Sequence, residues 1–84
     1  MDAINETNLL TRITVNPEIF GGKPIIRGHR LAVEHVLGMP AVGYSWETLL
    51  EGHPWLEAED IQACLRYAQR AVDGTRFEPA MMEA

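Results

Sequence analysis

The sequence has a single cysteine, Cys64, and no long apolar run among its 84 residues. One cysteine excludes a disulfide within the chain and also excludes a cysteine-rich metal site. No apolar stretch approaches the roughly 20 residues that a membrane-spanning helix needs. The first ten residues, MDAINETNLL, lack the basic and apolar regions of a signal peptide. We therefore expect a cytoplasmic protein with no membrane segment.

The sequence also lacks the residue patterns of the common catalytic and cofactor sites. Residues 21–30, GGKPIIRGHR, combine glycines with a lysine, but a phosphate-binding loop would need a Ser or Thr and a following helix. The three histidines, His29, His35 and His53, do not have the spacing of a zinc site. Cys64 lies on the apolar side of an expected helix, which favours a core residue over a reactive thiol. We expect no enzymatic activity, no metal and no cofactor.

Positive charge is scarce and unevenly distributed. The formal net charge is −5, and residues 31–60 contain six acidic side chains and no Lys or Arg. Nucleic-acid affinity depends on neutralising phosphates, so this balance disfavours strong non-specific binding while leaving room for a local basic face. A chain this short predicts one domain, residues 1–84, and small domains often gain stability from a partner subunit. A homodimer is therefore the expected assembly.

The first part of the chain predicts a small β element. Residues 1–8 are polar, and residues 1–11 are expected to form a flexible N-terminus. Within residues 12–33, two short extended segments are expected around ITV at 13–15 and PIIRG at 24–28, and HRLAV at 29–33 can supply a third. We expect two or three short strands here.

Residues 33–73 change to helical spacing and predict three helices. The first helix is expected to bend or stop near Met39, because Pro40 removes a backbone donor and clashes with the preceding turn. The second helix is expected over residues 45–51, with Ser45 as its N-cap.

The last helix is the most strongly patterned segment. It is expected to begin at residue 57 or 58 and to end before Gly74. Its apolar side chains recur at intervals of three and four residues, as on a helix with one buried face; they are Ile61, Cys64, Leu65, Ala68 and Val72. Together, these elements predict a mainly α protein. We expect a three-helix bundle like a helix-turn-helix, preceded by the β element and followed by a tail at 74–84.

Three sets of side chains are candidates for binding. The last helix has Arg and Gln side chains of the type that reads base edges in DNA; these are Gln62, Arg66, Gln69 and Arg70. A solvated helix face explains the same residues, and acidic neighbours on that face would repel phosphates. The β element carries a second set of cations that could contact nucleic acid, namely Lys23, Arg27 and Arg30. The tail carries apolar side chains suited to a partner protein; these are Phe77, Met81 and Met82.

Three stretches resemble a known family. ITVNPEIFGGKPIIRGHRLAV at 13–33 resembles the N-terminal motif of the "domain of unknown function 433" family of bacteria and archaea. AVGYSWETLLEGHPWL at 41–56 and EDIQACLRYA at 59–68 resemble its later segments. The resemblance covers about residues 12–72. The chain departs from the family pattern where His29 replaces a usual Thr and His53 a usual Tyr.

The resemblance implies a fold similar to homeodomain-like helix-turn-helix proteins, and members that look like dimers. It also implies a function, because many members are thought to be antitoxins paired with small PIN-like ribonuclease toxins. The leading hypothesis is therefore an antitoxin of a bacterial type II toxin–antitoxin pair that silences such a toxin and binds its own promoter DNA. The alternatives are a stand-alone dimeric DNA-binding regulator and a structural or interaction protein.

Overall fold

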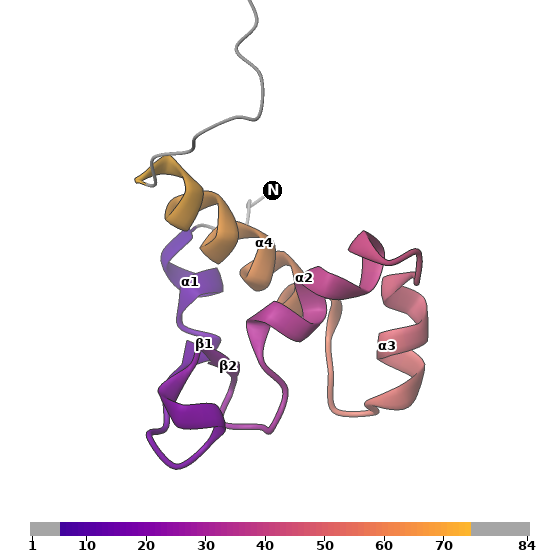
Figure 1. The fold of residues 1–84 in the computed structure, drawn as a ribbon, viewed down its shortest axis with the longest axis horizontal. Coiled ribbons are helices and arrows are strands. Elements are labelled where there is room, and N and C mark those ends of the chain that lie inside the picture. Colours follow the sequence, from indigo (N-terminus) through magenta and orange to yellow (C-terminus); the bar gives the residue numbers. More distant parts are fainter. Residues whose placement is uncertain (1–5, 75–84) are drawn as a thin grey trace, which may run out of the picture.

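The protein is mainly helical, with a small sheet near its N-terminus (Figure 1). The structure is a computed structural model that describes residues 6–74. Its elements are α1 (Glu6–Leu10), β1 (Ile13–Thr14), the 3-10 turn η1 (Phe20–Gly22), β2 (Ile25–Ile26), α2 (Val33–Ala41), α3 (Trp46–Gly52) and α4 (Ala58–Asp73). The predicted fold class is thus confirmed in its mainly α character and in its N-terminal β element.

The sheet is a two-stranded antiparallel pair. Ile13 lies opposite Ile26, and Thr14 lies opposite Ile25. The segment expected to supply a third strand contributes only a single bridge between Ile25 and Ala32. Both isoleucines of β2 are fully buried, so this short sheet serves as one wall of the core.

Helix α2 continues through Pro40 and ends at Ala41, two residues beyond Met39, where the helix was predicted to bend or stop. A proline at position 40 cannot donate a hydrogen bond to the carbonyl four residues earlier, which belongs to Val36. The indole Nε1–H of Trp46 donates to that carbonyl oxygen instead, at 2.9 Å. The chain therefore tolerates the proline because the next helix supplies the missing donor.

The boundaries of α3 and α4 agree with the sequence. The Oγ of Ser45 accepts a hydrogen bond from the backbone N–H of Thr48, as an N-cap should. Helix α4 follows its N-cap residue Glu57, and Gly74 caps its other end. The predicted N-cap of α3 at Ser45 and the predicted extent of α4 are confirmed.

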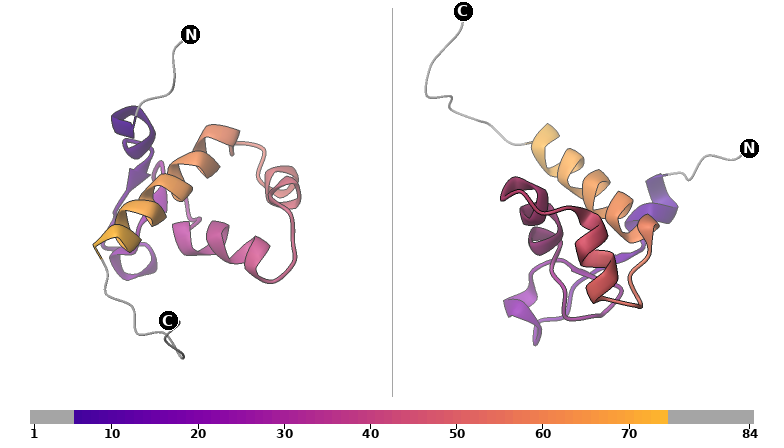
Figure 2. Two further views of the ribbon diagram at one scale, coloured as in Figure 1. Left: turned by 90° about the horizontal axis from the view of Figure 1, so that it is seen from above. Right: turned by 90° about the vertical axis from the view of Figure 1, so that its right-hand side faces the viewer.

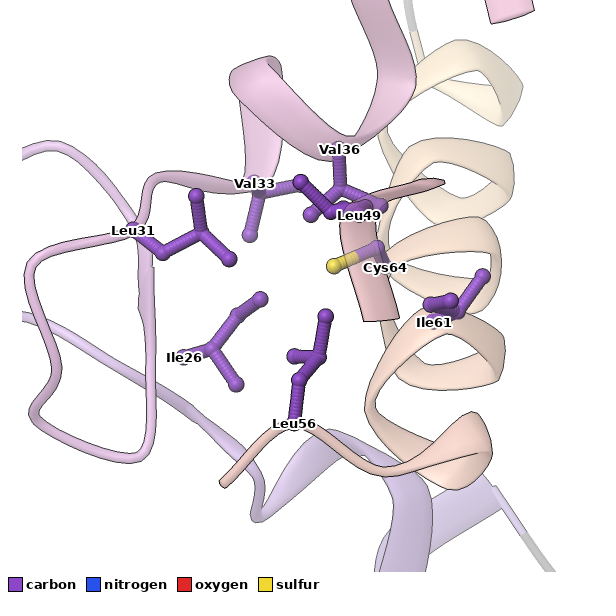
Figure 3. Packing of buried hydrophobic residues seen from close by; sticks show 8 residues of the cluster. All are labelled: Ile26, Leu31, Val33, Val36, Leu49, Leu56, Ile61 and Cys64. Carbon is purple, nitrogen blue, oxygen red and sulfur yellow. The ribbon is translucent and has the colours of Figure 1, made fainter. Parts of the chain in front are cut away.

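The core lies where the sheet and the three longer helices meet (Figure 3). Its buried cluster consists of Ile26, Leu31, Val33, Val36, Leu49, Leu56, Ile61 and Cys64. Burial and the nearby charge of Asp60 raise the pKa of the Cys64 thiol to about 12. The thiol is therefore protonated at neutral pH and acts as a small apolar residue, as predicted.

Helix α1 is a feature that the sequence did not predict. Residues 1–11 were expected to be flexible, yet α1 packs against α4 with Leu9 only 6% exposed (Figures 1 and 2). A helix of five residues is unstable alone, so its stability comes from this tertiary contact, which leaves no periodic signal in so short a segment.

No helix within residues 6–74 combines the length and the apolar character required to cross a membrane.

Candidate functional site

Three of the four candidate nucleic-acid residues of α4 lie beside α1, along a groove that the two helices form. The groove has a volume of about 440 Å³ and is lined by Leu9, Gln62, Leu65, Arg66 and Gln69. We call it the α1–α4 groove. Leu9 and Leu65 supply its apolar surface, and the other three side chains supply its polar surface. The polar face of α4 thus forms one wall of this groove, and Gln62 and Gln69 remain exposed on it.

Two of these polar side chains are already hydrogen-bonded to each other. The Nη1 of Arg66 donates to the Oε1 of Gln69 at 2.7 Å. Arg70 lies one turn further along α4 and lines a neighbouring hollow with Leu10 and Tyr67. The docking of α1 therefore restricts how this face of α4 could enter a DNA groove.

The apolar stripe of α4 is buried over only part of its length. Ile61 and Cys64 belong to the core. Leu65 is 43% exposed and Val72 is 70% exposed, although both belong to the same stripe. Helix α4 is longer than the core that covers it, so the stripe runs out from the core towards the C-terminal end. We call Leu65, Ala68 and Val72 the exposed stripe.

The strongest electrostatic feature is a buried carboxylate at the start of α4. The side chain of Asp60 is fully buried. Its Oδ1 accepts hydrogen bonds from Arg12 Nη1 and Arg27 Nε, each at 2.9 Å. Its Oδ2 accepts from Arg27 Nη2 at 2.8 Å and from the backbone N–H of Glu57 at 2.9 Å. Arg12, Arg27, Glu57 and Asp60 form what we call the Asp60 cluster.

The cluster favours the charged form of Asp60. Burial raises the pKa of the Asp60 carboxyl, but hydrogen bonds from Arg27, the Glu57 backbone and Arg12 outweigh it, so the net pKa lies below the ordinary value. The pKa of Arg27 is raised in turn by its bond to Asp60, and the pKa of Arg12 by its bonds to Glu57 and Asp60. Arg12 also pairs with Glu57 Oε1 at 2.7 Å. This pairing neutralises the carboxylate where the sheet meets α4.

The structure separates the three cations of the β element. Arg27 forms an ion pair with Asp60 and also donates a hydrogen bond from Nη2 to the backbone oxygen of Trp55 at 2.8 Å. Lys23 forms an exposed ion pair with Glu34 at 3.2 Å. Arg30 is exposed, and no hydrogen bond or ion pair joins it to the rest of residues 6–74. Arg27 is thus a structural residue, while Arg30 keeps its charge available at the surface.

The backbone of Arg27 shows how closely its position is fixed. Its φ is +46°, in the left-handed region that non-glycine residues seldom occupy, and Gly28 follows with φ +75°. The strain is of order 1–2 kcal/mol for a non-glycine residue. This turn aims the guanidinium at α4, so the Asp60 cluster offsets the strain.

The two histidines that depart from the family pattern contact the same indole. The ring of His29 stacks on Trp55 with centroids 3.7 Å apart and an interplanar angle of 4°. His53 meets Trp55 edge-on at 6.0 Å. The guanidinium of Arg27 lies 5.6 Å from the same ring. The connection between α3 and α4 is therefore fastened to the β element by aromatic contacts as well as by charge.

Sequence reasoning missed Asp60 and Arg12 as members of one cluster. In the sequence, Asp60 is one of several acidic residues at the start of a helix, where the helix dipole favours a negative charge. Its position three residues after the N-cap does match a capping box, since it accepts from the Glu57 backbone. Nothing in the sequence, however, indicates that two distant arginines reach the same carboxylate.

The remaining site predictions concern the C-terminal tail and a metal site. The candidate partner-binding residues Phe77, Met81 and Met82 lie outside the described residues. Within residues 6–74, no three His, Cys, Asp or Glu side chains gather in a way that could hold a metal ion.

The fold and the site together define a small helical domain, preceded by a two-stranded sheet and joined to it by a buried carboxylate. Such a domain matches the family described as "Protein of unknown function (DUF433)", whose model covers residues 13–68. The chain belongs to this family, as its motifs predicted.

Two relatives support the assignment. The chain is 42% identical over 57 residues to "Uncharacterized protein y4eO" of Sinorhizobium fredii (strain NBRC 101917 / NGR234). This match covers 68% of the chain and 26% of that protein, so the chain spans about a quarter of its relative's length. A crystal structure of a DUF433 member from Anabaena variabilis ATCC 29413 has a TM-score of 0.70 at 28% identity. That match covers 80% of this chain and 66% of the other.

Proposed function

We propose that this chain is a non-enzymatic, antitoxin-type binding protein that silences a small PIN-like ribonuclease. The class of toxin is taken from the family resemblance. The observation that carries the protein-binding part is the exposed stripe of α4, where Leu65 and Val72 leave the core. Contiguous exposed apolar surface bordered by polar residues commonly marks a protein contact.

The charges of the described residues support a protein partner over DNA as the main target. Affinity for DNA needs Lys and Arg side chains that can pair with phosphates. Arg12 and Arg27 are engaged with Asp60, and Lys23 is engaged with Glu34. Glu47 and Glu51 are exposed on α3, so phosphates would also meet repulsion. An acidic protein is better suited to a basic partner, such as a nuclease whose RNA-binding surface is positive.

Co-expression with the product of the adjacent gene tests the proposal. The expected result is that the neighbour's product arrests growth alone, that this chain restores growth, and that the two proteins co-purify. Val72→Asp should reduce co-purification at least tenfold, because it places a charge on the exposed stripe. Val15→Asp is the matched control, since Val15 is 63% exposed and lies outside α4 in the sequence. An adjacent product that is not nuclease-like, or normal binding by Val72→Asp, contradicts the proposal.

Promoter binding by a dimer is a second candidate function. Gln62 and Gln69 are exposed beside Arg66, as base-reading side chains would have to be. A dimer that binds its promoter would lose affinity steeply with salt, and the double substitution Arg66→Ala and Arg70→Ala would reduce that salt dependence. Unchanged promoter affinity in the double variant would exclude this face of α4.

A further inference from the structure

We propose that the turn between α2 and α3, together with the exposed face of α3, docks on a lysine- and arginine-rich surface of a partner protein. We call residues 42–51 the α2–α3 edge. The inference rests on the proposed function for the identity of the partner. A ribonuclease needs a surface of this charge to bind RNA phosphates, so the chain would silence the nuclease by occupying its RNA-binding surface.

The edge begins with exposed apolar side chains that the core does not use. Residues 40–45 are exposed without interruption, and Val42 and Tyr44 are 70% and 58% exposed. The residues on either side of the turn face inward instead, since Met39 and Trp46 pack against the core cluster. Adjacent exposed apolar side chains bordered by polar residues commonly mark a protein contact. Tyrosine is also one of the residue types that contribute most to binding energy in such contacts.

Backbone hydrogen bonds fix the shape of this turn. The N–H groups of Val42 and Tyr44 both donate to the carbonyl oxygen of Met39, at 3.2 Å and 2.9 Å. The N–H of Gly43 donates to the carbonyl oxygen of Pro40 at 3.1 Å. Gly43 has a φ of +96°, which residues with a side chain seldom adopt. A turn that is already ordered loses little conformational freedom on binding, so it presents its apolar side chains in a fixed geometry.

The charge beside the turn indicates the chemistry of the partner. Glu47 and Glu51 are exposed on α3, and residues 31–60 contain no Lys or Arg. No cation of residues 6–74 forms an ion pair with either carboxylate. The two side chains are four residues apart, so they are neighbours on the helix surface and repel each other weakly. Cations of a partner would relieve this repulsion, and such charge complementarity speeds association and selects between partners.

The same charge disfavours the other possible occupants of the edge. A second copy related by a two-fold axis through this surface would bring its own Glu47 and Glu51 towards those of the first. The phosphates of nucleic acids and the anionic lipids of a membrane surface would also be repelled. A cationic protein surface with an apolar hollow for Tyr44 suits both the turn and the carboxylates.

The α2–α3 edge lies on the same side of the domain as the C-terminal end of α4. Both lie towards the top in Figure 1 and in the right view of Figure 2. The exposed stripe, which the proposed function assigns to the partner, includes Val72 at that end of α4. One partner can therefore contact both surfaces, and two contacts within one complex share a single loss of translational and rotational freedom.

Calorimetry with the purified product of the adjacent gene tests the apolar part of the edge. Val42→Lys should weaken binding at least about tenfold, because it removes an apolar contact and places a like charge against a cationic surface. Val15→Lys is the matched control, since Val15 is 63% exposed and lies outside residues 31–60. It should bind as tightly as the unsubstituted chain.

Association kinetics at varied salt test the acidic part of the edge. Glu51→Gln should slow association about twofold at low salt and leave it unchanged at high salt, where the charges are screened. Glu18→Gln is the matched control, since it removes an exposed carboxylate from the β element, and it should have a smaller effect at low salt. In a cleavage assay with an RNA oligonucleotide, the unsubstituted chain should raise the apparent KM and leave the maximal rate unchanged.

Two results overturn the inference and leave the proposed function intact. The first is normal binding by Val42→Lys to a nuclease that the chain silences. The second is inhibition that lowers the maximal rate without raising the apparent KM, which would place the chain away from the RNA-binding surface. A product that binds through the α2–α3 edge but neither cleaves RNA nor arrests growth rejects the antitoxin role alone. A product that does not bind the chain overturns both.

Discussion

Replacing Asp60 with Asn tests whether the Asp60 cluster stabilises the fold. The substitution keeps the size of the side chain but removes its charge. It also replaces one acceptor oxygen with an NH₂ group that faces N–H donors of the cluster. Removing one partner of a buried ion pair costs about 3–5 kcal/mol. The Asp60 side chain is 0% exposed, but those of Arg12 and Arg27 are 27% and 34% exposed and can regain hydrogen bonds to water. We therefore expect the free energy of unfolding to fall by about 3 kcal/mol, at the lower end of that range.

This loss is large for a domain of 84 residues. Total stability at this size is roughly 4–13 kcal/mol, and each kcal/mol corresponds to about 4–8 °C in the melting temperature. Asp60→Asn should therefore lower the melting temperature by about 12–24 °C. Urea unfolding followed by tryptophan fluorescence and by circular dichroism gives the free energy. Trp55 lies against the cluster and Trp46 packs against the core, so the fluorescence of both indoles is informative.

Arg30→Gln is the matched control for this experiment. It also removes one charge, from a residue three positions after Arg27 with no ion pair in the described part of the chain. We expect a change within about 0.5 kcal/mol, as for most surface substitutions. A loss in Asp60→Asn no larger than that of the control would refute the stabilising role of the cluster.

The pH dependence provides a second test of the same reasoning. The pKa of Asp60 is lower in the folded chain than in the unfolded chain, where an Asp has a pKa of about 3.9. Its contribution to stability is therefore complete above the unfolded pKa and is lost as pH falls towards the folded pKa. The difference in stability between the unsubstituted protein and Asp60→Asn should be constant at neutral pH and narrow below about pH 4. A constant difference down to pH 3 would contradict the lowered pKa.

Three further predictions concern single contacts. Trp46→Phe should lower the free energy of unfolding by about 1–2 kcal/mol, because it leaves the Val36 carbonyl without its donor. Adding Pro40→Ala should recover part of this loss by restoring a backbone N–H. An equal loss from Trp46→Phe with Pro40 and with Ala at position 40 would refute the compensation. Ser45→Ala should cost about 1 kcal/mol through loss of the N-cap, and an unchanged urea midpoint would show that the cap contributes nothing. Cys64 should resist a thiol reagent at pH 8 in the folded protein and react after unfolding, because its pKa is about 12; rapid reaction in the native state would refute its burial.

The predictable parts of the fold are those governed by local rules. The cap at Ser45, the extent of α4 and the end at Gly74 each depend on neighbouring residues, and the sequence predicted them. Pro40 shows the limit of such rules, because its penalty was judged correctly but the donor that offsets it lies six residues away in another helix. Helix α1 was missed because tertiary packing of Leu9, and not helix propensity, stabilises it.

The candidate site was less predictable because charges pair across the fold. In the sequence, Arg27 is one of three cations of the β element that could contact nucleic acid. The structure assigns Arg27 to Asp60, 33 residues away, so reversing its charge would destabilise the protein whatever it binds. Arg30 is the better position to test such a contact by charge reversal, since changing it should leave the fold intact.

The Asp60 cluster also has a kinetic consequence. Helix α4 can place Asp60 near the Glu57 N–H as soon as its first turn forms, but the arginines come from residues 33 and 48 positions away. Closing such long loops has an entropic cost that must be met before the ion pairs can contribute. We expect the ion pairs to form after the rate-limiting step of folding, so Asp60→Asn should accelerate unfolding and leave the folding rate nearly unchanged. The cluster would then act mainly by lowering the unfolding rate, which extends the lifetime of the native state.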